Sequence, residues 1–169
     1  MGNFSESIKE YRRQLEKGHI KEAYQGLMKY IAGLRLHLKN KYPDYFVSGD
    51  VNYGQMDFSY FYFFPASLKK SNLKIVILFI HETFTFEIWL AGYNKNVQER
   101  YLKLFKEDKW NKYTLAVTSG GIDYIVKHTL AENADFNDLD ALTHQIETGA
   151  LNFIRDIEKS VSQLIAKDI

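Results

Sequence analysis

The stretch from Met56 to Gly92 constrains the fold of this chain most strongly, because it holds three strand-like runs and most of the strongly apolar residues. Residues 73–80 are apolar on both faces, as expected for a central strand covered on both sides. Residues 84–91 alternate between two faces: Phe84, Phe86, Ile88 and Leu90 on one, and Thr85, Glu87, Trp89 and Ala91 on the other. The turn His81-Glu82-Thr83 between the two runs predicts an antiparallel hairpin.

An aromatic strand is predicted before this hairpin, within residues 51–64, and Pro65 ends it. Gly54 interrupts the run. We interpret it as a bulge or the end of a short preceding strand, and a hairpin turn is the alternative. Residues 66–72 are polar and long enough for one helical turn.

The rest of the chain shows mainly helical spacing of apolar residues. Helices are predicted over residues 5–17, 20–41, 94–108 and 137–166. A fourth strand is predicted at residues 113–117, and a short helix at Ile122, Ile125, Val126, Thr129 and Leu130. The predicted fold is α+β: an antiparallel three-stranded meander, extended by a further strand after a crossover helix and packed against N- and C-terminal helices. We expect one domain over residues 1–169.

Composition excludes several classes of function. The sequence has no cysteine, which rules out disulfides, thiolate metal sites and a cysteine nucleophile. Its five histidines are not paired at ligand spacing, so we expect no bound metal and no cofactor. The longest apolar block, residues 75–80, is too short to span a bilayer, and the net charge of +1 is too small to indicate nucleic-acid binding. We therefore expect a cytoplasmic protein without a membrane or nucleic-acid partner.

The candidate site lies on the polar face of the second hairpin strand. Glu87 is a carboxylate within an apolar strand, and Trp89 shares its face. If the hairpin pairs symmetrically about Glu82, Glu87 lies opposite Ile77, and Tyr60 and Tyr62 can share the face from the aromatic strand. One acid with several aromatic rings could bind a cation or a small polar ligand.

Two alternatives stay open for these residues. Glu87 could simply face solvent on the outer side of the sheet, and a one-residue change of register would exchange Tyr60 and Tyr62 for Phe61 and Phe63. Elsewhere, Ser119-Gly120-Gly121 follows a predicted strand and could hold an anion on its amides.

Three segments carry a resemblance to a known family: LKIVILFIHETFTFEIWLAGYNKNVQERYLKLFKEDKW, the upstream KNKYPDYFVSG and the later DFNDLDALTHQIETG. Together they resemble a family of small bacterial proteins known only as a domain of unknown function, over residues 10–159. The resemblance implies a bacterial, cytoplasmic, single-domain protein. It assigns no catalytic residue.

The predicted element order is also similar to the core of restriction-endonuclease-like proteins. There an acid ends the second strand and a Glu-x-Lys lies in the third. Here Trp89 stands two residues after Glu87, in the place of the Lys, and the second strand ends at Ile80-His81. Mg²⁺ needs those ligands in such enzymes. We therefore expect a non-enzymatic domain that binds a small polar ligand or a protein partner. The alternative is a divergent nuclease-like or other hydrolytic enzyme that uses Glu87, Glu82 and His81.

Overall fold

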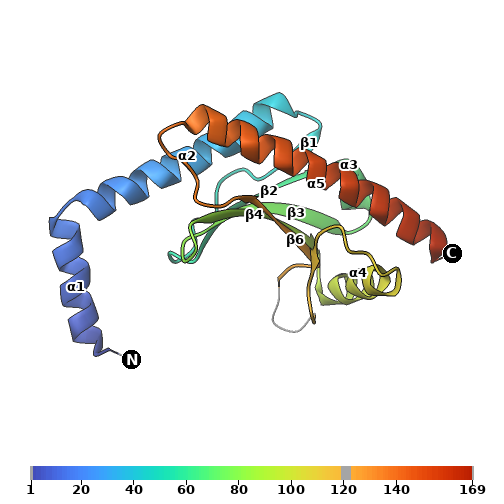
Figure 1. The fold of residues 1–169 in the computed structure, drawn as a ribbon, viewed down its shortest axis with the longest axis horizontal. Coiled ribbons are helices and arrows are strands. Elements are labelled where there is room, and N and C mark those ends of the chain that lie inside the picture. Colours follow the sequence, from blue (N-terminus) through green and yellow to red (C-terminus); the bar gives the residue numbers. More distant parts are fainter. Residues whose placement is uncertain (1, 119–122, 169) are drawn as a thin grey trace.

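A computed structural model describes residues 2–118 and 123–168. In these residues six strands form one antiparallel sheet in the order β1-β2-β3-β4-β6-β5 (Figure 1). The strands are β1 (Tyr45–Val47), β2 (Phe58–Pro65), β3 (Leu73–Ile80), β4 (Thr85–Gly92), β5 (Thr114–Leu115) and β6 (Val126–Ala131). The α+β class that the sequence predicts is confirmed.

The central meander β2-β3-β4 follows the sequence prediction closely. Its register places Glu87 opposite Leu78, one residue from the predicted partner Ile77. Phe84 was also predicted in the strand, but it lies in the turn before β4, with a φ of 54° and 58% of its surface exposed. Because side chains alternate along a strand, the apolar face of β4 is made by Phe86, Ile88 and Leu90 alone.

Two long helices cover one face of the sheet. Helix α2 (His19–Lys41) and helix α5 (Leu139–Lys167) lie above it in Figure 1. Their buried side chains, such as Leu34 of α2 and Phe153 of α5, join one hydrophobic cluster with Phe61, Ile77 and Ile88 of the sheet. We call this side of the sheet the helix face and the opposite side the open face. Strand β3 is buried on both of its faces, as its apolar pattern predicts: on the open face, Val76 and Leu78 are only 7% and 3% exposed.

The remaining helices differ in how much of their surface is buried. Helix α1 (Phe4–Glu16) extends away from the sheet and has no buried residue, although Ile8, Tyr11 and Leu15 form an apolar stripe on it (Figure 1). Helix α3 (Ala66–Lys70) is the predicted helical turn, and α4 (Lys95–Glu107) is the predicted crossover helix. No helix within the described ranges is both long and apolar enough to cross a membrane.

The structure differs from the prediction in three places. The segment predicted as a short helix forms β6, which pairs with β4 inside the sheet. The strand predicted over residues 113–117 is reduced to the two residues of β5, at the sheet edge beyond β6. Strand β1 was not predicted at all. Ile122 and the loop Ser119-Gly120-Gly121 lie outside the described residues.

Gly54 lies in a hairpin turn, which is the alternative that the sequence left open, and not in a bulge or at the end of a short strand. Asn52 and Tyr60 pair through their backbones on either side of it, and Gly54 has a φ of 61°. A Cβ at this position would collide with the backbone oxygen of Phe58. Only glycine adopts this conformation without strain in so little space.

We predict a large loss of stability when the centre of the helix face is truncated. Ile77 is 1% exposed, so Ile77→Ala should lower the free energy of unfolding by about 2–5 kcal/mol. Ile8→Ala on α1 is the matched control. Ile8 is 48% exposed, so this change should cost below about 1 kcal/mol. Urea unfolding of both variants measures the difference, and equal losses would contradict this assignment of the core.

Candidate functional site

Two rows of side chains cross the open face. Strand register aligns Tyr60, Leu78, Glu87 and Thr129 in the first row, and Tyr62, Val76, Trp89 and Lys127 in the second. All four predicted site residues therefore lie on one face of the sheet. The register that would have replaced the two tyrosines by Phe61 and Phe63 is not adopted, because both phenylalanines are buried on the helix face.

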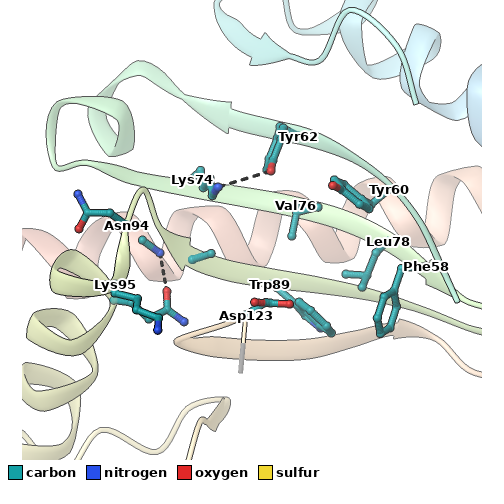
Figure 2. Close-up of a pocket in the computed structure, with 13 residues that line it drawn as sticks. Phe58, Tyr60, Tyr62, Lys74, Val76, Leu78, Trp89, Asn94, Lys95 and Asp123 are labelled. Carbon is teal, nitrogen blue, oxygen red and sulfur yellow. Dashed lines mark hydrogen bonds between the residues drawn. The ribbon is translucent and has the colours of Figure 1, made fainter. Parts of the chain in front are cut away.

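A cavity of about 440 Å³ occupies this face (Figure 2). Residues of β2, β3 and β4 form its floor, and residues at the beginning of α4, together with Asp123, line its sides. Its lining residues are Phe58, Tyr60, Tyr62, Lys74, Val76, Leu78, Trp89, Ala91, Gly92, Asn94, Lys95, Gln98 and Asp123. The size is within the range of pockets for small organic ligands.

Neighbouring groups hold the aromatic rings of the cavity in place. The ring of Trp89 contacts Phe58 edge-on at 5.7 Å and Tyr124 at 5.2 Å between centroids. The hydroxyl of Tyr60 accepts a hydrogen bond from Asn52 at 3.0 Å, and its ring meets that of Tyr62 at 5.9 Å. These orientations are therefore fixed without any ligand.

Glu87 supports this wall but does not line the cavity. Its side chain is only 11% exposed, and Oε2 accepts the indole N–H of Trp89 at 2.6 Å. Its other oxygen lies 4.0 Å from the ammonium group of Lys127. The carboxylate thus has a donor and a cation from the protein itself. Its position supports a role in orienting Trp89 more directly than a role in contacting a ligand.

Lysines define the other end of the cavity, and sequence reasoning missed them. Lys74 of β3 has its Nζ 5.1 Å from the ring centroid of Tyr62 and 5.7 Å from that of Tyr93. Lys95 begins α4 just after the helix cap Asn94 (Figure 2). The alternation Lys74-Val76-Leu78 along β3 was a signal that could have placed Lys74 on the face of Trp89.

A serine and a histidine lie close together on the helix face of the sheet, beside α2. Ser59 Oγ is 2.9 Å from His81 Nε2, as in a nucleophile with its base. Ser59 is completely buried, however, and its hydroxyl donates to the backbone oxygen of Tyr53 at 3.1 Å. Burial also lowers the pKa of His81. The pair therefore connects β2 to the β3–β4 turn and presents no nucleophile to a substrate.

The most strongly perturbed acid of the helix face is Glu147 of α5, which is 8% exposed. Its carboxylate accepts hydrogen bonds from His37 at 2.6 Å, from Lys41 at 2.6 Å and from the hydroxyl of Tyr42. Burial alone would raise the pKa of Glu147, but these three partners lower it to about 2. The cluster connects the end of α2 to α5, and every partner comes from these elements or from Tyr42 beside them.

The positions that would hold a metal in a nuclease-like site are used differently here. Glu87 pairs with Trp89 and Lys127, and His81 contacts Ser59. Across residues 2–118 and 123–168, no three His, Asp or Glu side chains gather so that they could hold a metal ion. In the described part of the chain, the ligand set that a nuclease-like site would need is therefore not assembled.

The Glu147 cluster predicts a pH-dependent stability. Because the pKa of Glu147 in the folded protein lies below its ordinary value of 4.5, its contribution is present above about pH 4.5 and is lost as the pH falls toward 2. Glu147→Gln should be less stable than the wild type by about 1–3 kcal/mol at pH 7. This difference should shrink between pH 4.5 and pH 2.

Thermal or urea unfolding at several pH values measures this effect. Glu16→Gln is the control, because Glu16 forms an exposed ion pair with Arg12 at 2.9 Å and such pairs contribute little. A Glu147→Gln variant as stable as the wild type at pH 7 would contradict the prediction.

Comparison with known proteins gives one match. Residues 4–161, which extend from the start of α1 into α5, match the family described as domain of unknown function DUF7000. No curated protein and no solved structure matches the chain. The resemblance to a family of unknown function that the sequence indicated is thereby confirmed. Since the match spans most of its length, the chain belongs to the DUF7000 family.

Proposed function

We propose that this protein is a non-enzymatic binding domain and that the cavity of the open face receives a small planar molecule. The observation that carries the proposal is a set of aromatic rings, Phe58, Tyr60, Tyr62 and Trp89, gathered around a cavity of about 440 Å³. Aromatic side chains at an accessible cavity offer stacking area to a planar ligand.

Preorganisation supports binding at this site. Trp89 is held by Glu87, Tyr60 by Asn52, and Tyr62 by Lys74, whose Nζ is 3.5 Å from the tyrosine hydroxyl. A ligand would therefore order few side chains as it binds, which lowers the entropic cost of association. The concave shape favours a small molecule over a protein partner, since the rings surround a hollow and do not form a flat patch.

The proposal places this function in the bacterial cytoplasm. The absence of cysteine from the sequence fits a reducing compartment, where disulfides do not stabilise proteins. The hydrolytic alternative is less well supported by the geometry, because Glu87 and His81 are already bonded to neighbouring side chains.

We predict that a neutral planar probe binds in the cavity. Indole-3-carboxamide, titrated to millimolar concentrations, should shift the NMR signal of the Trp89 indole N–H and of backbone amides in β2, β3 and β4, with saturation. The signal of Trp110, the second tryptophan, is identified by its absence in Trp110→Phe. Tyr60→Ala should weaken binding about fivefold or more, because one ring of the wall is lost.

Tyr11→Ala is the matched control, since Tyr11 is 57% exposed on α1, far along the chain from the cavity residues. It should leave the dissociation constant unchanged. Shifts scattered over the surface, or equal effects of the two substitutions, would refute the proposal. Mg²⁺-dependent cleavage of DNA that is abolished by Glu87→Gln would favour the nuclease-like alternative instead.

A further inference from the structure

The two ends of the cavity differ in chemistry, and we infer from this that the ligand is a planar aromatic molecule bearing an anionic group, a carboxylate or a phosphate. The ring would lie against Trp89 and Phe58, and the anion would lie between Lys74 and Lys95. This inference rests on the proposed function, because it assigns a ligand class to the same cavity.

The cationic end is made by Lys74 and Lys95. In the described ranges no carboxylate lies within ion-pair distance of either lysine. Lys74 is instead placed over the rings of Tyr62 and Tyr93. Figure 2 shows both lysines toward the end of the cavity where α4 begins. Two unneutralised cations at one end of a cavity attract an anionic group.

The aromatic end carries the opposite charge. Asp123 is the acid among the residues that line the cavity. Burial raises the pKa of Tyr60, and the charge of nearby Asp123 contributes to the same rise. Asp123 therefore lies near the aromatic rings, where it repels an anion and can accept a hydrogen bond from a ring N–H. The charges orient a ligand with its acidic group toward the lysines.

The strand register sets the length of such a ligand. Val76 lies opposite Trp89 and Lys74 lies opposite Ala91, so Lys74 is two residues along β3 from the position beside Trp89. Strands rise about 3.3 Å per residue, so about 7 Å separates the two positions. A one- or two-ring compound whose acidic group is attached directly or through a single sugar spans this separation.

Matched probe pairs test the inference. Indole-3-carboxylate is compared with indole-3-carboxamide, and adenosine 5′-monophosphate with adenosine, by NMR titration of the full chain at low salt. The acid of at least one pair should bind about fivefold tighter than its neutral partner, as expected for a partly exposed charge pair. The pair that shows the preference identifies carboxylate or phosphate as the anionic group.

Lysine variants assign the preference to this end of the cavity. In the double variant Lys74→Gln, Lys95→Gln, acid and neutral partner should bind within about twofold of each other. The ratio of the two affinities is the readout, because Lys74 also holds the Tyr62 ring and its loss can change the binding of both partners equally. Lys70→Gln on α3 removes an exposed charge elsewhere and should leave the preference intact.

The outcomes separate the two proposals. Equal binding of acid and neutral partner in both pairs, or a preference that persists in the double variant, would overturn the anionic class while the cavity function stands. If neither neutral nor acidic probes shift the Trp89 signal, both proposals fail.

Discussion

The pairing register of β3 with β4 is the constraint on which the rest of this structure depends. It aligns Ile77 with Ile88 and Phe79 with Phe86 toward the helices, and the same pairing forces Glu87 and Trp89 onto the open face. A slip of one residue would exchange the two faces completely. Burial of the apolar set under α2 and α5 therefore fixes the geometry of the cavity as well as the core.

The part of the fold that depends on strong alternation could be predicted from the sequence, and the part that depends on distant pairing could not. The meander and the long helices follow from local patterns. Strand β6 does not, because Ile125, Val126, Thr129 and Leu130 also satisfy helical spacing. Pairing with β4, more than thirty residues earlier, decides its conformation. Strands β1 and β5 have three and two residues, too few for any period to be visible.

The same limit explains which features of the candidate site were anticipated. Alternation within each strand suggested that Tyr60, Tyr62 and Trp89 could share one face, but the register between the strands, which decides it, could not be predicted. The environment of Glu87 could not be foreseen, since its cationic neighbour Lys127 belongs to β6, which had the pattern of a helix. With that neighbour in place, the carboxylate is one half of a buried polar contact. The contacts with Trp89 and Lys127 therefore explain why Glu87 lies within an apolar strand. They weaken the case that Glu87 binds a cationic ligand.

Glu147 of α5 and Glu87 of β4 are both buried acids, but one stabilises the packing of the helices and the other supports the cavity. Glu147 receives three donors from one small region and joins α2 to α5. Glu87 receives the indole N–H of a ring that lines the cavity. Unpaired buried charges are costly, so both acids must be satisfied within the protein. Lys74 and Lys95 are under no such requirement, because water reaches them in the open cavity. The charges left available for a ligand are therefore the two lysines at the rim and Asp123 near the rings. The buried carboxylates act by holding the scaffold and the Trp89 ring in position.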